Sequence, residues 1–501
     1  MKKNLLSLLT LWIAFSASLY AGPVSVSDAQ NVALNFFKVT TNASTAPTAN
    51  LVYTKTGTNN SVSFYVFDFS PSKGFVIVAG DDNVIPILAY STENNFRTNF
   101  NHTGVNDWVN QTSARIQLAL QHNAIADARI QGQWSAYRQG QNPQTQRSGN
   151  AAGPLCMTAW DQENDISTPP PYIYNLFCPY NSVDAQRCLT GCVATAQAQI
   201  MKFWNYPAQG MGSFSYIDDT IHGYSANYGV QSSDFSSHTY QWSQMANMLT
   251  DATSGVADTA VAVLMYDCAV SVGMDFGDDN QNDSGANGLI AEEIIYGDSF
   301  SSQYALVKYF DYDPDTIKGV FRSSYSDSAW IALMEHETDM GRPVLYEGND
   351  ASQGGHAWVC DGYNTNDQLH MNWGWSGYSD GYFAITNLTT PGNFNPIEQN
   401  DALIGIMPRV IPTGVKTLSN ELSFNVFPNP ANTQVMLQTN ETSNGAIWEF
   451  KNIVGQSVLS GSIAGQQTPI NVSGLASGMY LIEIHSGQKS MVKKLVISRE
   501  I

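Results

Sequence analysis

The residue best placed to act as a nucleophile is Cys192, in the stretch RCLTGCVATAQAQIMKFWNYP. The pair Thr190-Gly191 is typical of a helix start, and apolar residues then recur at three- and four-residue steps until Pro207. Cys192 is therefore expected in the first turn of an amphipathic helix. The unpaired N–H groups and the positive end of the helix dipole favour a thiolate there, which is the nucleophilic form of cysteine. Taken alone, the same residue could be a small buried hydrophobe.

A cysteine nucleophile needs a base, and two histidines compete for that role. His356 follows two glycines and begins an expected strand, so a sheet would fix its direction. If Asn372 lies on the adjacent strand, its side-chain carbonyl could accept a hydrogen bond from the imidazole, and Trp373 or Trp375 could shield that bond from water. His370 shares a strand face with Asn372 by two-residue alternation and is the rival base. The neighbouring glycines favour His356.

Acyl chemistry also needs donors for the oxyanion, and Gln186 lies six residues before Cys192. Its side-chain amide could join the Cys192 N–H in that role, although a loop glutamine is usually only solvated. The six cysteines all fall in the central part of the chain, and their spacing does not define a pairing.

Metal-dependent hydrolysis is the main alternative chemistry. A zinc-binding HExxH motif is absent, because His336 has no second histidine four residues away. Four aspartates could hold a structural Ca²⁺ through their carboxylate oxygens: Asp275, Asp278, Asp279 and Asp283. The sequence indicates no catalytic cofactor.

The elements around these residues predict an α+β domain. Helical patterns at residues 254–272 and 330–340 join the Cys192 helix in the first half. β-rich runs separated by Gly, Asn and Asp follow at residues 343–346, 356–361, 368–373 and 381–386. A helical first half and an antiparallel second half indicate two segregated lobes.

The N-terminal part begins with Lys2-Lys3, an apolar run and small residues near Ala21, which is typical of a secretory signal peptide. The net charge of −20 argues against nucleic acid as a partner. A small α+β unit follows, with helices expected at residues 28–37 and 114–137 and strands at 63–69, 75–79 and 84–90. Residues 139–153 are polar and lack apolar periodicity, so we expect a linker that proteases can cut.

The C-terminal part, residues 415–501, predicts a small β-sandwich. Short strands are expected at regular spacing: residues 424–427, 434–438, 447–452, 457–460, 479–485 and 493–497.

The motifs GCVATAQAQIMKFWNYP, GGHAWVCDGYN and NWGWSGYSDGYF resemble those of the streptopain family of cysteine peptidases, within the papain superfamily. The resemblance implies Cys192 as nucleophile and His356 as its base, with Asn372 and Trp373 at the supporting positions. Gln186 has the spacing of a papain-type oxyanion glutamine. The stretch GFVIVAGDDNVIPILAYS resembles the streptopain propeptide, which keeps the zymogen inactive. Cys188, close to Cys192, is a departure that leaves the redox control of the site open.

The C-terminal motifs VFPNPA, GMY and KLVI resemble the sorting domain of type IX secretion cargo. This resemblance implies passage through the outer membrane of a Gram-negative cell, followed by release or surface attachment, with the type IX machinery as partner. The expected domains are a signal peptide (1–21), an inhibitory propeptide (22–140), a maturation linker (141–153), a papain-like two-lobed peptidase (154–412) and a sorting β-sandwich (415–501).

These expectations combine into a secreted cysteine endopeptidase zymogen that acts on protein or peptide substrates and is inhibited by its own propeptide. Two alternatives stay open on the sequence. An acyltransferase would use the same cysteine and histidine but pass the acyl group to an amine. A secreted adhesin would have the same tail, but it would have no reason to keep Cys192, His356 and Asn372 together.

Overall fold

The chain forms two compact units, Met1–Val410 and Ile411–Ile501, and each is described here by itself. The computed structural model describes residues 22–41, 47–57, 60–71, 73–98, 104–143, 151–162, 174–182, 185–218, 227–249, 255–277, 284–289, 300–350, 354–386, 388, 399–409, 424–439, 446–452, 455–486 and 489–499. Within these residues, no helix combines the length and apolar character needed to cross a membrane.

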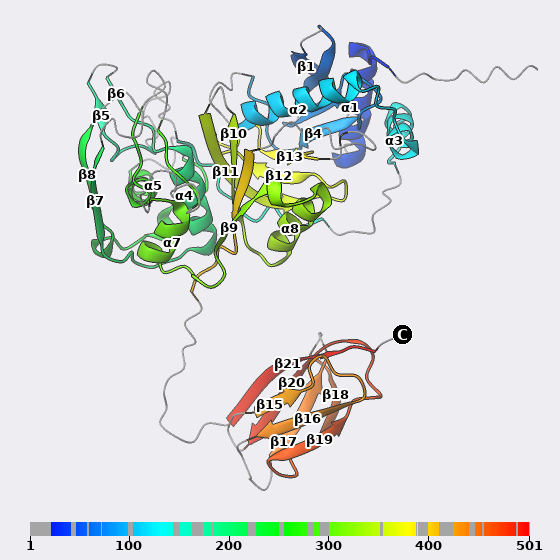
Figure 1. Cartoon of the computed structure of the whole chain (residues 1–501), viewed down its shortest axis with the longest axis vertical. Helices are drawn as coiled ribbons and strands as arrows, with labels where there is room; N and C mark the ends of the chain where they lie inside the picture. Colours follow the sequence, from blue (N-terminus) through cyan, green and yellow to red (C-terminus); the bar gives the residue numbers. More distant parts are fainter. Residues whose placement is uncertain are drawn as a thin grey trace, which may run out of the picture. The chain divides into compact units, whose positions relative to one another are not determined.

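The N-terminal part of the first unit is a four-stranded antiparallel meander covered by helices (Figure 1). Its elements are α1 (Val26–Thr41), β1 (Thr48–Thr56), β2 (Val62–Ser70), β3 (Phe75–Ala79), β4 (Ile87–Ser91), α2 (Gly104–Gln121) and α3 (Ala128–Arg138). The single helix expected at residues 114–137 is therefore wrong. Asn123, with a φ of 54°, follows α2, and the Asp127 side chain accepts from the Ile130 N–H to start α3.

The rest of this unit has the expected helical and antiparallel halves. Its helices are α4 (Cys192–Trp204), α5 (Val256–Ser271), α7 (Ser302–Phe310) and α8 (Asp327–Asp339), with short 3-10 helices at Phe235–Ser237, Trp242–Gln244 and Arg322–Ser324. Its strands are β5 (Tyr180–Asn181), β6 (Gln186–Arg187), β7 (Ser213–Asp218), β8 (Gly229–Asp234), β9 (Lys318–Phe321), β10 (Val344–Asp350), β11 (Gly354–Tyr363), β12 (Leu369–Asn372), β13 (Gly381–Phe383) and β14 (Gln399–Ile404).

The two parts share one sheet in the order β1-β2-β3-β4-β13-β12-β11-β10-β14-β9. The seam is the antiparallel pair β4–β13, where Tyr90 lies opposite Tyr382 and Ala89 opposite Phe383. Gln368 donates across the seam to the Ile87 carbonyl at 3.0 Å. The N-terminal part is thus joined to the central part by main-chain pairing as well as by side chains.

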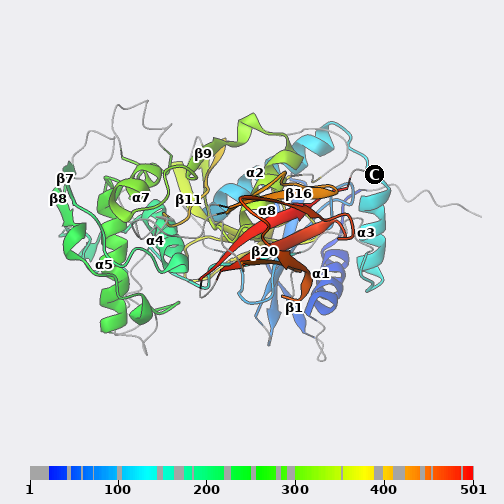
Figure 2. The same ribbon diagram turned by 90° about the horizontal axis from the view of Figure 1, so that it is seen from below.

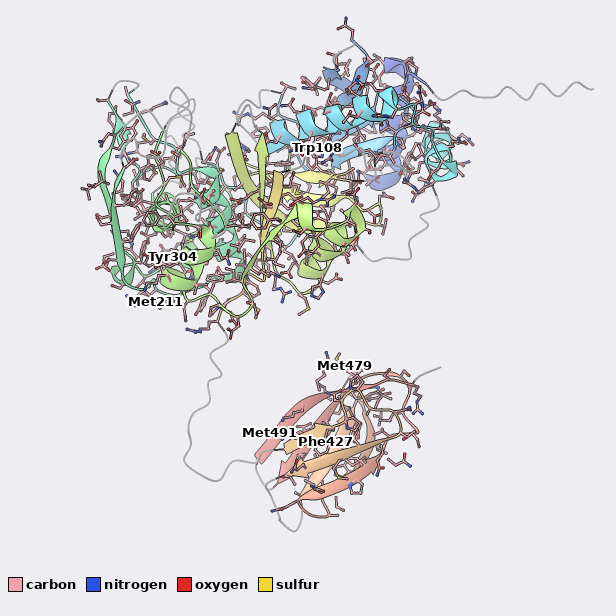
Figure 3. All side chains as sticks on the ribbon, viewed as in Figure 1. Trp108, Met211, Tyr304, Phe427, Met479 and Met491 are labelled. Atoms are coloured by element: carbon pink, nitrogen blue, oxygen red, sulfur yellow. The ribbon has the colours of Figure 1, made fainter. Side chains whose placement is uncertain are left out.

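Strand alternation gives the central sheet two different faces. Tyr346 and Trp358 pack in a core with α2 and α8, whereas Leu345 and Val359 pack in a second core with α4 and α5. Figure 2, seen from below, shows α4 and α5 in the green half and α2 and α8 in the other. Trp108, labelled on α2 in Figure 3, docks this helix by donating to the Ala384 carbonyl at 3.0 Å.

The second unit is the expected β-sandwich. One sheet has the order β15-β16-β19 and the other β18-β17-β20-β21, and side chains from both fill one core. The strands are β15 (Phe424–Phe427), β16 (Gln434–Thr439), β17 (Ile447–Lys451), β18 (Ser457–Ser462), β19 (Gln467–Asn471), β20 (Gly478–Ser486) and β21 (Lys489–Ile497).

Candidate active site

Cys192 is the first residue of α4, so the helix start expected from the sequence is confirmed. Gly191 precedes it with a φ of 91°, and a Cβ there would fall 2.6 Å from the Met274 side chain. Both the backbone conformation and the close approach therefore require glycine. The thiol lies where the N–H groups of the first turn and the helix dipole would stabilise negative charge.

Cys192 differs from the other cysteines of the chain in its exposure to solvent. Its side chain is partly exposed, whereas those of Cys156, Cys178, Cys188, Cys268 and Cys360 are buried. Burial raises the pKa of the Cys178 thiol to about 12 and also raises the pKa of the Cys156, Cys268 and Cys360 thiols. These four groups stay protonated near neutral pH and are poor nucleophiles, because the thiolate is the reactive form.

His356 lies on β11 and is only 8% exposed. Burial lowers the pKa of its imidazole to about 4, although a hydrogen bond with the Trp373 backbone acts in the opposite direction. Its Nε2 atom is buried and has no hydrogen-bond partner among the described residues. The ring is therefore neutral near pH 7, and no hydrogen bond joins its Nε2 to Cys192 in this form of the chain.

Aromatic rings enclose the imidazole. Trp358 stacks against His356 with the ring centroids 6.4 Å apart, and Trp375 does so at 6.0 Å, both within 22° of parallel. Trp373 in turn contacts Trp358 at 4.9 Å between centroids. This apolar surrounding explains why the charged form of the imidazole is disfavoured.

The N-terminal part of the chain closes the remaining side of this aromatic group. Gly104, the first residue of α2, lies so close that a Cβ there would fall 2.7 Å from Trp358 Cε3 and 2.8 Å from His356 Cδ2. On the other side, the Arg97 guanidinium lies 5.3 Å from the ring centroid of Trp375. Residues 97 and 104 thus both lie against the aromatic rings that enclose the candidate base.

In the full-length chain the candidate base packs against tryptophans of the first core, whereas Cys192 packs against the second core. His356 shares the β11 face of Trp358, which packs with α2, whereas α4 and Cys192 pack against the opposite face. Contact with α2 therefore holds the imidazole beside the first core in the full-length chain.

The hydrogen bond expected between Asn372 and His356 is not formed in the full-length chain, although the two strands are adjacent as expected. Asn372 lies opposite Val359 in the β11–β12 register, on the face of α4. Its Oδ1 accepts from Gln199 Nε2 at 3.1 Å and from the Gly374 N–H at 3.2 Å. The contact recorded for the imidazole is instead with the backbone of Trp373, the next residue.

Trp373 lies beside the imidazole, although it does not cover an Asn372–His356 bond. Its side chain is 1% exposed, and its indole N–H donates to the Ser379 carbonyl at 3.1 Å. Its backbone N–H donates to the Asp380 carboxylate at 2.8 Å. These bonds hold the tryptophan in a fixed place next to the candidate base.

His370, the rival base, is tied into a different group. Its Nδ1 lies 2.6 Å from Oδ1 of Asp361, whose side chain is fully buried, and the Tyr382 ring meets it edge-on at 5.1 Å. Burial acts to lower the pKa of His370, but Asp361 overcomes that effect and raises it. A histidine whose ring nitrogen is already bonded to a buried carboxylate is poorly placed to accept a proton from Cys192.

Gln199 is a residue that sequence reasoning missed. It lies on α4 two turns after Cys192, is fully buried, and donates to Asn372 across the boundary between α4 and β12. Asn372 also donates to the Thr158 carbonyl at 2.6 Å, and the Trp160 N–H donates to Gln199 at 3.4 Å. The available signal was a glutamine at a helix position expected to be buried, although Gln197 gives the same signal.

The remaining candidates are the oxyanion donor Gln186 and the aspartates that could bind calcium. Gln186 is half-buried on β6, paired with Asn181 in a short hairpin before α4, and its role as an oxyanion donor stays a prediction. Of the possible calcium ligands, Asp275 is buried and pairs its backbone with Gly285. The other three, Asp278, Asp279 and Asp283, lie outside the described residues.

Comparison with known proteins agrees with this arrangement. Residues 170–383 match the Peptidase C10 family, residues 21–116 match the Spi protease inhibitor, and residues 425–498 match the secretion system C-terminal sorting domain. A solved fragment of prointerpain A from Prevotella intermedia is similar at a TM-score of 0.55 and 26% identity, covering 73% of this chain and all of that fragment.

Curated relatives include two named peptidases. Streptopain of Streptococcus pyogenes is 29% identical over 357 residues, which cover 69% of this chain and 81% of streptopain. The thiol protease/hemagglutinin PrtT of Porphyromonas gingivalis is 29% identical over 431 residues, covering 84% of this chain but only 45% of that protein. The chain thus spans less than half the length of this second relative. Its central part is a Peptidase C10 domain, preceded by a domain like the Spi protease inhibitor and followed by a secretion sorting domain.

Proposed function

We propose that this protein is a secreted cysteine endopeptidase made as an inactive zymogen. The observation that carries the proposal is the contact of Gly104 with His356, by which the inhibitor-like domain covers the candidate base of the Peptidase C10 domain. Its substrates would be proteins or peptides. The names of both curated relatives support this reaction class.

In the proposed reaction, Cys192 and His356 act as a pair once the N-terminal domain has left. The imidazole takes the thiol proton, and the sulfur attacks the peptide carbonyl carbon to form a tetrahedral oxyanion. The N–H groups at the start of α4 and the Gln186 amide would stabilise that charge. The imidazolium then gives its proton to the leaving amine, and water hydrolyses the thioester with the same histidine as base.

Latency would come from three anchors of the N-terminal domain besides Gly104. The Trp108 indole and the Arg115 guanidinium donate to the consecutive carbonyls of Ala384 and Ile385, at 3.0 and 2.6 Å. The β4–β13 pairing supplies the third anchor. Because the two carbonyls lie just beyond β13, the bonds from Trp108 and Arg115 would align α2 along the sheet, with its first residue against His356.

We infer that the maturation cut falls before Ala152. The backbone of Ala152 exchanges hydrogen bonds with Tyr363, and the Leu155 and Cys156 N–H groups donate to the Asp361 backbone and side chain. A chain cut after Ala152 would lose part of this pairing at the far end of β11. The expected linker, residues 141–153, would then be cut within its first eleven residues.

The sorting domain supports export to the cell surface or the medium, and we propose the type IX machinery as its partner. Labelling with a thiol-reactive peptidase inhibitor, followed by peptide mapping, tests the whole proposal. We expect Cys192 to be modified in the processed protein and to react far more slowly in the full-length chain. Modification of another cysteine would contradict it.

No observation on the structure favours an acyltransferase or an adhesin over a peptidase. Mass analysis of casein digests, with and without an added amine, separates the three activities. A peptidase gives hydrolysed products in both cases, a transferase gives amine adducts, and an adhesin gives neither.

A further inference from the structure

The first residue after the expected signal peptide is held in place by Asp82. The Gly22 N–H donates to Asp82 Oδ1 at 2.6 Å, and the Asp82 N–H donates back to the Gly22 carbonyl at 3.1 Å. The next residues continue the pairing, since the Val24 N–H donates to the Gly80 carbonyl at 2.9 Å. The start of the exported chain is therefore bound at a defined carboxylate.

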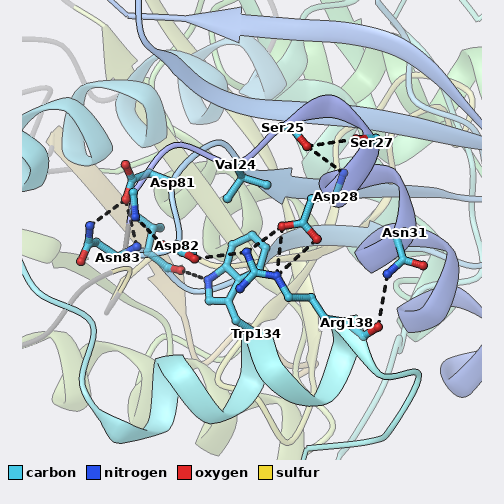
Figure 4. Close-up of polar contacts among 12 residues, drawn as sticks. Val24, Ser25, Ser27, Asp28, Asn31, Asp81, Asp82, Asn83, Trp134 and Arg138 are labelled. Carbon is cyan, nitrogen blue, oxygen red and sulfur yellow. Dashed lines mark hydrogen bonds and ion pairs between the residues drawn. The ribbon is translucent and has the colours of Figure 1, made fainter. Parts of the chain in front are cut away.

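Among the residues that the structure describes, the charges around this carboxylate do not balance. Asp82 Oδ2 lies 3.1 Å from the Arg138 guanidinium, which is also bonded to both oxygens of Asp28, the closest at 2.7 Å (Figure 4). One cation thus serves two carboxylates, and a third carboxylate, Asp81, lies next along the chain. Arg138 is held further by its stacking over Trp134 at 4.8 Å. A second positive charge beside Asp82 would improve the balance.

We propose that Asp82 is the binding site for the α-ammonium group created when the signal peptide is removed between Ala21 and Gly22. Hydrolysis of that bond by a signal-cleaving endopeptidase adds one water, leaving a carboxylate on Ala21 and an amine on Gly22 that takes up a proton. The nitrogen that donates one neutral hydrogen bond in the uncut chain then becomes a cation. It pairs with Asp82 without moving.

This contact would connect removal of the signal peptide to the stability of the inhibitor-like domain. Asp82 lies in the turn between β3 and β4, Arg138 on α3 and Asp28 on α1, so the new ion pair would complete a network joining three elements. Before processing, the network lacks this charge and the domain would be less stable. The inference concerns the N-terminal domain and does not depend on peptidase activity.

The ion pair has a defined pH dependence. Asp82 contacts the amine directly, and Arg138 from α3 and Asp28 from α1 follow it in the chain of ion pairs. Asp81 is adjacent to Asp82 in the β3–β4 turn, and the Tyr65 hydroxyl of β2 donates to the Val24 carbonyl. An α-amine ordinarily titrates at a pKa of about 7.7–8.0, and a paired carboxylate raises that value. The added stability would be complete below about pH 7.7 and lost as the pH rises through the raised pKa.

The test uses the full chain from Gly22 with Cys192→Ala, which prevents self-cleavage. N-terminal sequencing of the secreted protein should find Gly22. Reductive ¹³C-methylation then allows the α-amine pKa to be followed by NMR. We expect a value raised by about half a unit or more, returning to the ordinary range in Asp82→Asn and staying raised in the control Asp28→Asn, whose carboxylate does not contact Gly22.

A chain that keeps Ala21 provides a second measurement, because its amine is displaced by one residue while every side chain is retained. Its amine should titrate normally, and its thermal midpoint near pH 7 should be lower than that of the chain starting at Gly22. The proposal is overturned by a secreted chain with another N-terminus, by an ordinary α-amine pKa in the Gly22 chain, or by a raised one that Asp82→Asn leaves unchanged.

Discussion

Gly104 lies against His356 so closely that a single added carbon on the glycine would fall 2.8 Å from the imidazole Cδ2. The two residues come from different domains, and α2 begins at the glycine. The contact therefore buries the candidate base beneath the N-terminal domain.

Gly104→Ala should weaken the hold of the N-terminal domain on the peptidase. The new Cβ would meet three aromatic ring atoms within 3.0 Å, and overpacking of this kind typically costs about 1–3 kcal/mol. We expect the inhibition constant of the separately made N-terminal domain to rise by about fivefold or more. Gly132→Ala is the matched control, because that glycine also lies in a helix and its Cβ would meet nothing within 4 Å. If the Gly104→Ala and Gly132→Ala domains inhibit the peptidase equally well, the contact of Gly104 with His356 does not contribute to inhibition.

Cys192→Ala should abolish peptide hydrolysis while the fold is retained. The residue is partly exposed and lies at the end of a helix, so its replacement leaves no buried cavity. Loss of a catalytic nucleophile typically costs about 10⁶-fold in rate. Casein cleavage measures the activity, and circular dichroism measures the fold. Activity that survives unchanged would assign the chemistry to another group.

His356→Ala should be as damaging as Cys192→Ala, because the two groups would act as a unit. His370→Ala is the informative comparison, since His370 is the alternative candidate for the base and pairs with the buried Asp361. We expect His370→Ala to lower stability and keep measurable kcat. If activity is lost in His370→Ala and kept in His356→Ala, His370 is the base and the assignment of His356 is wrong.

Acid should weaken the binding of the N-terminal domain. Burial holds the His356 pKa at about 4 in the full-length chain, and exposure after release should return it toward about 6.5. The bound state therefore takes up the proton less readily, and its affinity falls as the pH drops between these two values. With those two pKa values, the dissociation constant near pH 5 should be roughly 30-fold higher than at about pH 7.5.

Calorimetry on the Cys192→Ala peptidase measures this effect without turnover. His356→Gln in the same background is the control, because glutamine does not titrate. Any pH dependence of binding that remains in the control belongs to other groups near the seam. Asp380 is one such group, because burial raises the pKa of its carboxyl to about 7. If the control keeps the full 30-fold change, His356 is not the group responsible.

Local signals predicted the Cys192 helix and the strand after His356 well. Helical periodicity and a glycine-framed strand start depend only on neighbouring residues. Contact between Asn372 and His356 depends on register, and a shift between Cys360 and Gly362 helps to set that register in the full-length chain. The sequence shows two strands here but not which residues lie opposite one another.

The covering of His356 by Gly104 could not have been predicted either. It depends on the β4–β13 seam, which joins segments far apart in the chain, and on the carbonyls that bind Trp108 and Arg115. A glycine at the start of a helix carries no signal of a close approach to another domain. Family resemblance predicted that the N-terminal domain inhibits, but not the residue that does so.

Gln199→Leu should lower kcat more than it changes KM. Its amide supports Asn372, whose neighbour Trp373 contacts the imidazole through its backbone, so the glutamine would act as a positioning residue. Leaving the Asn372 acceptor with one bond fewer in a buried site costs about 1–3 kcal/mol. If about 1.4 kcal/mol of this reaches the transition state, kcat falls about tenfold. The pH profile of kcat/KM should shift as well, because the histidine would lose its fixed position.

Gln197→Leu is the matched control for this prediction. Gln197 is equally buried on the same helix, but its amide points to Ser271 at 3.4 Å and not to Asn372. Both variants should lower the thermal midpoint, while only Gln199→Leu should change kcat and the pH profile. If the two variants lose kcat to the same extent with unchanged pH profiles, the effect comes from a general loosening of α4, and the connection from Gln199 through Asn372 to His356 is not functional.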